Sequence, residues 1–131
     1  MPLKLSLKPT EAVVVNGAVI RNGERRSTLL LETKARILRE RDVMFPEEVN
    51  TNFEAAYFAV MQMYLTGETD GPLYDACIVA LANIVRDAPS DELCDEIMMI
   101  SRFVASGQLY RAIGACRKLE RELPTPDLRD E

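Results

Sequence analysis

Residues 12–23 read Ala-Val-Val-Val-Asn-Gly-Ala-Val-Ile-Arg-Asn-Gly, and this stretch is the strongest local signal of fold in the chain. Asn-Gly dipeptides suit the positive φ angles of a type I′ turn. Asn16-Gly17 lies between two apolar runs rich in β-branched residues, so it predicts a hairpin. A second dipeptide, Asn22-Gly23, follows six residues later. The two turns together predict a tight antiparallel meander.

Strand patterns continue on both sides of this stretch. Leu3, Leu5 and Leu7 alternate with polar residues, which is the period of a half-buried strand. Further runs over 26–32 and 34–41 complete five expected strands. The last run alternates as a strand does, although its composition also suits a helix.

After residue 45 the hydrophobic period becomes helical. Thr51 and Glu54 fit a capping box, and Gly67 suits the end of that first helix. Three more helices are expected: one from Pro72 to about Ala88, one capped by Ser90 with Met98 facing inward, and one from roughly Gln108 to Leu123. The predicted fold class is α+β, with a small antiparallel β-sheet or barrel-like meander followed by an α-helical bundle of about four helices.

Charge divides the chain in the same place as the expected secondary structure. Residues 1–50 carry nine Lys or Arg against seven Asp or Glu, whereas 51–131 carry seven against fourteen. We therefore expect a basic β-rich segment over 1–45, an acidic helical region over 46–123 and a frayed polar tail over 124–131. The field that a ligand meets is local, so an anion is expected at the first segment.

The residue types present argue against catalysis. The 131 residues include no histidine, which removes the usual general base near neutral pH and the commonest metal ligand. Neither metal-finger spacing nor a phosphate-binding glycine loop occurs, so no enzyme, no cofactor and no metal site are expected. Cys77, Cys94 and Cys116 are odd in number and widely spaced, which favours core positions in a reducing compartment. Without an apolar leader or a membrane-length apolar run, we expect a cytoplasmic protein that does not bind membranes.

Nine basic residues fall on the expected strands or their connections, and six of them are arginines. Two interpretations of these basic residues are open. They occupy solvated edge positions that hinder aggregation, or they form a phosphate-binding surface. On the second reading the expected RNA contacts are Arg39, Arg41, Lys4, Lys8 and Arg36. Strand alternation would put Arg39 and Arg41 on one face and Arg36 on the other.

Aromatic residues are scarce in the basic segment, where Phe45 stands alone. Tyr57, Tyr64, Tyr74 and Tyr110 fall on the expected helices and are interpreted as core or helix-packing residues rather than a base-stacking platform. Met61, Met63, Met98 and Met99 are interpreted as adaptable core, with a groove for a partner helix as the alternative.

Three segments carry a family resemblance: Met-Pro-Leu-Lys-Leu-Ser-Leu-Lys-Pro at 1–9, Val-Asn-Gly-Ala-Val-Ile-Arg-Asn-Gly-Glu-Arg-Arg at 15–26, and Ile-Leu-Arg-Glu-Arg-Asp-Val-Met at 37–44. With 57–65 and 110–113, they resemble the FlbT family of flagellin synthesis regulators up to about residue 123. The resemblance implies an alphaproteobacterial regulator that acts on the 5′ untranslated region of flagellin mRNA, alongside a small flagellar partner, FlaF. The chain departs from the family in having Thr10 where glycine is usual, and in its short tail.

The first and last expected strands also have a looser similarity to the carbon storage regulators, which are small five-stranded RNA-binding proteins. That similarity implies an RNA-contacting role for Arg39 and a first-strand binding region at Leu5 and Lys8. Because the binding site of that family is shared between two subunits, it also implies a homodimer.

Two functional hypotheses follow. The first is a post-transcriptional repressor of flagellin synthesis that binds the leader of flagellin mRNA and affects its stability and translation. The second is a protein-interaction adaptor or a flagellin-chaperone-like module, in which the acidic, methionine-bearing helices hold a partner and any effect on mRNA is indirect.

Overall fold

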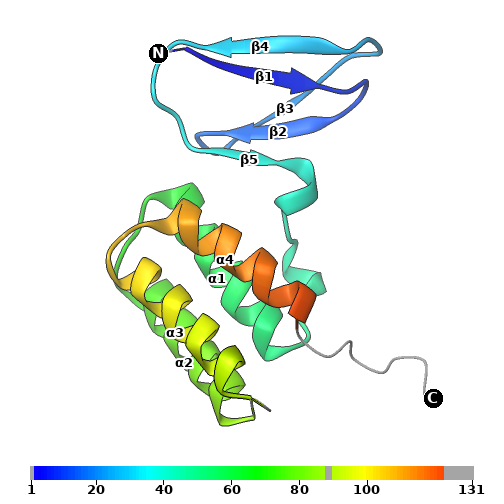
Figure 1. Cartoon of the computed structure of the whole chain (residues 1–131). Helices are drawn as coiled ribbons and strands as arrows, with labels where there is room; N and C mark the ends of the chain where they lie inside the picture. The colour runs from blue at the N-terminus through cyan, green and yellow to red at the C-terminus, as the bar shows by residue number, and fades with distance from the viewer. Residues whose placement is uncertain (1, 88–89, 123–131) are drawn as a thin grey trace, which may run out of the picture.

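Five short strands precede four helices in the computed structural model, which describes residues 2–87 and 90–122 (Figure 1). The strands are β1 (Leu3–Leu7), β2 (Ala12–Val15), β3 (Ala18–Arg21), β4 (Ser27–Leu31) and β5 (Ile37–Arg39). Two short 3-10 helices, η1 (Glu40–Asp42) and η2 (Pro46–Glu48), lead to α1 (Asn52–Thr66), α2 (Pro72–Arg86), α3 (Asp91–Ala105) and α4 (Leu109–Glu122). The predicted α+β class is confirmed. The predicted frayed tail lies outside the described residues.

The strands form two small antiparallel sheets, β1-β4 and β3-β2-β5, and the second lies between the first and the helices (Figure 1). Val13 of β2 packs with Leu5 and Leu7 of β1, while Val14 and Leu38 pack into the helical core. Strand β2 is therefore buried on both faces. This explains why its sequence is a continuous apolar run, while β1 alternates.

The hairpin predicted at Asn16-Gly17 is confirmed, but the meander does not continue. Asn16 and Gly17 have φ angles of 50° and 87°, and β2 pairs with β3. Strands β3 and β4, in contrast, belong to different sheets, so the second hairpin expected at Asn22-Gly23 is wrong. The Asn22 amide instead donates to the carbonyls of Lys8 (2.8 Å) and Arg25 (2.9 Å), which redirects the chain toward β1.

The fifth strand is shorter than predicted. It spans Ile37–Arg39 rather than 34–41, and the chain then turns into η1. Within η1 the Glu40 carboxylate accepts a hydrogen bond from the Ala12 backbone N–H at 2.8 Å, an interaction that a continued strand would not make. Strand alternation therefore does not apply to Arg36 and Arg41, because Arg36 precedes β5 and Arg41 lies on η1.

The helices begin and end close to the predicted residues. The Thr51–Glu54 capping box is present, Gly67 ends α1 at φ 82°, and Ser90 caps α3. The predicted stripes are largely buried, and burial raises the pKa of the Cys77 and Cys116 thiols to about 11 and about 12. The prediction that Met98 faces inward is wrong. Met98 and Met99 are both about half exposed, at 51% and 46%. No described helix is long and apolar enough to cross a membrane.

Thr10 has a φ of 61°, in the left-handed region that disfavours a β-branched residue. We expect Thr10→Gly to raise the free energy of unfolding by about 0.5 to 1 kcal/mol, since strain relief outweighs the added freedom of the unfolded chain. Urea unfolding measures this change. The control is Asn16→Gly, for which no gain is expected because the Asn16 side chain accepts a hydrogen bond from the Arg36 backbone N–H at 2.8 Å. Equal gains would contradict the strain argument.

Candidate nucleic-acid interface

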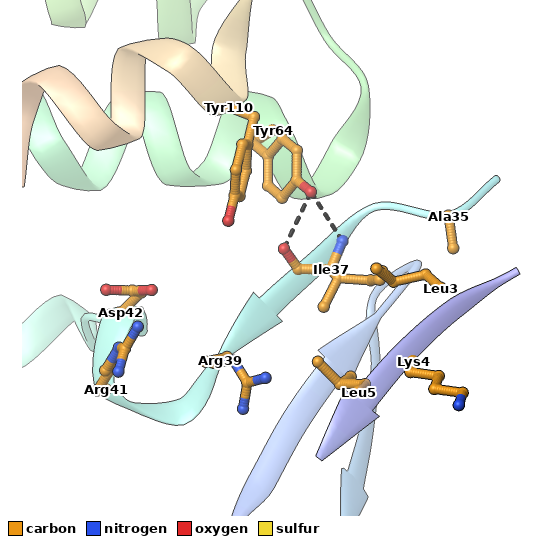
Figure 2. A pocket seen from close by; sticks show the side chains of 10 residues that line it. All are labelled: Leu3, Lys4, Leu5, Ala35, Ile37, Arg39, Arg41, Asp42, Tyr64 and Tyr110. Carbon is orange, nitrogen blue, oxygen red and sulfur yellow. Dashed lines mark hydrogen bonds between the residues drawn. The ribbon is translucent and has the colours of Figure 1, made fainter. Parts of the chain in front are cut away.

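A groove of about 540 Å³ lies where β1, β5 and η1 meet the helices (Figure 2). It brings together residues that are far apart in the sequence. Its lining contains three basic side chains, one acidic side chain and two tyrosines among apolar positions: Leu3, Lys4, Leu5, Ala35, Ile37, Arg39, Arg41, Asp42, Tyr64 and Tyr110. Three of the five predicted RNA contacts therefore line one groove.

Arg39 is the most constrained of the three basic side chains. It is 30% exposed, donates to the Ser6 carbonyl oxygen at 3.2 Å and lies 3.5 Å from a Glu11 carboxylate oxygen. These contacts join β5 to β1 and to the turn that follows β1. Arg39 thus has a structural role in addition to any contact with a ligand, and removing it would disturb the strands that form the groove.

The side chains of Arg41 and Lys4 are less constrained than that of Arg39. Both side chains are exposed, and no ion pair within residues 2–87 and 90–122 includes either of them. Figure 2 shows Arg41 at the η1 end of the groove and Lys4 at its rim, with the Lys4 ammonium directed away from the two arginines. A lysine side chain has a flexible four-carbon stem, so this rim position can be adjusted to a bound phosphate.

The other two predicted contacts lie elsewhere. Lys8 follows the far end of β1, four residues beyond Lys4 and about 13 Å away along an extended strand. Arg36 precedes β5, and its guanidinium lies beside Gly67 at the end of α1. The fold therefore does not bring all five predicted residues onto a single surface.

Two tyrosines on α1, seven residues apart, attach the helices to the β segment. The Tyr64 hydroxyl accepts a hydrogen bond from the Ile37 N–H (2.7 Å) and donates to the Ile37 carbonyl (2.9 Å), as the dashed lines in Figure 2 show. Two helical turns earlier, the Tyr57 hydroxyl donates to the Asp42 carbonyl. Sequence patterns predicted helix packing for both rings. They gave no signal that the hydroxyl groups reach β5 and η1.

Arg117 of α4 completes this joint and was missed by the sequence analysis. Its Nε donates to Asp42 Oδ1 at 3.1 Å, and its Nη2 donates to the Arg41 carbonyl at 2.7 Å. The guanidinium also lies over the Tyr57 ring, 4.7 Å from the ring centroid. Only the spacing of Arg117 beside the buried stripe of α4 could have drawn attention to it. Because it holds the backbone of Arg41, it fixes one wall of the groove.

Acidification is expected to weaken the fold through Glu11. The Lys8 backbone N–H bonded to Glu11, together with the charge of Arg39, lowers the pKa of that carboxyl below its usual 4.5. A carboxyl with a lowered folded-state pKa stabilises the fold above its unfolded pKa, and this contribution is lost as pH falls through the folded value. Urea unfolding from about pH 6 to about pH 3 should therefore show a smaller fall in the free energy of unfolding for Glu11→Gln than for the wild type. If the free energy of unfolding fell by the same amount in both proteins, the stabilising role of the Glu11 carboxylate would be contradicted.

Comparisons with known proteins identify the family. The family model described as flagellar protein FlbT matches residues 3–123. A Caulobacter vibrioides relative named flagellum biosynthesis repressor protein FlbT is 40% identical over 119 residues, covering 91% of this chain and 84% of the relative. A Rhodopseudomonas palustris relative named probable flagellum biosynthesis repressor protein FlbT is 36% identical over 120 residues, covering 91% and 92%. No solved structure matches significantly. The resemblance predicted from the sequence is confirmed, and the chain belongs to the FlbT family of flagellar proteins.

Proposed function

We propose that this protein is a post-transcriptional repressor of flagellin synthesis that binds the 5′ untranslated region of flagellin mRNA and so affects its stability and translation. The names of the relatives, flagellum biosynthesis repressors, support the flagellar and repressing parts of the proposal. The RNA part depends on one observation, which is that Lys4, Arg39 and Arg41 all line a single groove.

The charge distribution favours that groove as the point of RNA contact. The whole chain has a net charge of −5, so an RNA strand is repelled overall and binding requires a locally basic surface. Arginine forks pair with two phosphate oxygens at once and stack on unpaired bases, which suits a single-stranded leader. The acidic residue in the groove, Asp42, is already paired with Arg117 and therefore opposes an incoming phosphate less than a free carboxylate would.

The test compares two RNAs with the full-length protein at one fixed salt concentration. One is the flagellin leader, and the other has the same length and base composition in shuffled order. The proposal predicts tighter binding of the leader. Equal affinities would overturn leader recognition, and the absence of binding to either RNA would overturn the RNA function itself.

A second candidate, the adaptor for a FlaF-like flagellar protein, is favoured by the exposure of Met98 and Met99 on α3. Adjacent exposed methionines suit a contact with an apolar helix face. On this alternative, Met98→Glu/Met99→Glu abolishes capture of the FlaF-like protein and leaves leader binding unchanged. Retained capture would contradict the adaptor surface.

A further inference from the structure

Tyr110, in the first turn of α4, is exposed over 64% of its surface although its ring contacts another ring. The centroids of Tyr110 and Tyr64 are 5.6 Å apart, with the planes inclined at 43°. Because its hydroxyl is hydrogen-bonded to the Ile37 backbone, Tyr64 is held in place and the Tyr110 ring packs against it. Figure 2 shows the two rings side by side above β5, at the edge of the groove. An aromatic face fixed in this way and open to solvent suits stacking by a planar ligand group.

A second hollow, of about 510 Å³, lies on the other side of this tyrosine pair. It shares Tyr64 and Tyr110 with the groove, so the two rings form a ridge between the two depressions. Its charged lining residues come from separate parts of the fold: Lys34 and Arg36 from the β4–β5 connection, and Arg111 from α4. Within the part of the chain that the structure describes, no carboxylate lines it.

The position of Arg36 shows how this hollow is formed. A Cβ at Gly67, which ends α1 with φ 82°, would lie 3.8 Å from the Arg36 guanidinium. The Arg36 guanidinium therefore lies against the end of α1, in the same hollow as Tyr64. No ion pair within residues 2–87 and 90–122 includes Lys34, Arg36 or Arg111. The second hollow is therefore more purely cationic than the groove, where Asp42 is present and Arg39 is paired with Glu11.

We propose that the ridge and the second hollow form the other half of the RNA site. An unpaired base stacks on Tyr110, and the neighbouring phosphates lie on Lys34, Arg36 and Arg111. The proposal rests on the proposed RNA function and extends it, since it assigns RNA contacts to the helical region and defines the ligand as single-stranded RNA. A cationic track interrupted by an exposed aromatic ring is the general arrangement for binding a single strand, because every base has a face that can stack.

The decisive variants separate the ring from the fold. Tyr110→Ala is expected to weaken binding of the unpaired leader RNA about tenfold, and Tyr110→Phe to leave it within about twofold, because phenylalanine keeps the stacking face. The matched control is Phe45→Ala, which removes another exposed aromatic ring outside both hollows. Urea unfolding of each variant shows whether the fold is retained.

Two further measurements test the nature of the contact. The loss caused by Tyr110→Ala is expected on a single-stranded leader fragment and not on the same fragment annealed into a duplex, where the bases are already stacked. Lys34→Glu/Arg111→Glu is expected to weaken binding of either form, because phosphates are present in both. Equal losses for Tyr110→Ala and Tyr110→Phe would overturn stacking, and so would an equal loss on the duplex.

These outcomes are distinct from failure of the proposed function. If the wild-type protein binds the leader and the groove variant Lys4→Glu/Arg41→Glu binds it more weakly, unchanged affinity in both Tyr110→Ala and Lys34→Glu/Arg111→Glu overturns only the extended site. If the wild-type protein binds no RNA, the function and the extension are both overturned.

Discussion

Replacement of Arg117 by alanine is expected to lower the free energy of unfolding by about 2 to 4 kcal/mol. The side chain is only 28% exposed, and one guanidinium carries the Asp42 ion pair, the hydrogen bond to the Arg41 carbonyl and the contact with the Tyr57 ring. Its removal leaves the Asp42 carboxylate and a backbone carbonyl without their partner at the joint between the β segment and the helices. Urea or thermal unfolding of the full chain measures the loss.

Two control variants determine whether the geometry of this contact is responsible. Arg117→Lys keeps the charge but not the fork, so it should recover only part of the stability. Arg121→Ala, one turn further along the same helix and exposed, should cost less than about 0.5 kcal/mol. Equal effects of Arg117→Ala and Arg121→Ala would show that the joint does not hold the two parts together.

Charge reversal in the groove has the largest expected effect on binding. Lys4→Glu/Arg41→Glu should weaken binding of the flagellin leader about 100-fold, or about 2.8 kcal/mol, since two charge-assisted contacts become repulsive. Both side chains are exposed, so the fold should tolerate the change, which is an advantage over altering the bonded Arg39. Filter binding or a gel shift with labelled leader RNA measures it.

The matched control is Lys8→Glu/Arg25→Glu, which makes the same change of charge outside the groove on exposed residues of the same basic segment. Because distant surface charges are screened by salt, a loss within about threefold is expected. If the control variant lost as much affinity as Lys4→Glu/Arg41→Glu, binding would depend on overall charge rather than on the groove.

Local chemistry made much of the fold predictable. The Thr51–Glu54 box and the Gly67 stop satisfy nearby backbone groups, and Asn16-Gly17 has the positive φ angles that its turn requires, so the sequence around each of them is sufficient. Asn22 and the end of β5 were mispredicted because their partners are distant. Asn22 bonds to carbonyls at the end of β1, and Glu40 bonds to β2, so neither interaction is visible in a local pattern.

The candidate site shows the same limit. Residue type and clustering were enough to single out Arg39, Arg41 and Lys4, which line one groove. Lys8 and Arg36 belonged to the same cluster in sequence, but Lys8 follows the far end of β1 and Arg36 lines the second hollow instead of the groove. The roles of Tyr64, Tyr110 and Arg117 depend on how the helices meet β5 and η1, which no spacing along a single helix reveals.

The dependence of leader affinity on salt tests the groove as the RNA site most directly. Each phosphate contact of a single strand adds about 0.7 to the slope of log affinity against log salt concentration. The measurement compares the wild type with Lys4→Glu/Arg41→Glu over one salt series. We expect a slope shallower by about 1.4 in the variant, which corresponds to two lost contacts. Parallel lines for the two proteins would contradict phosphate binding in this groove.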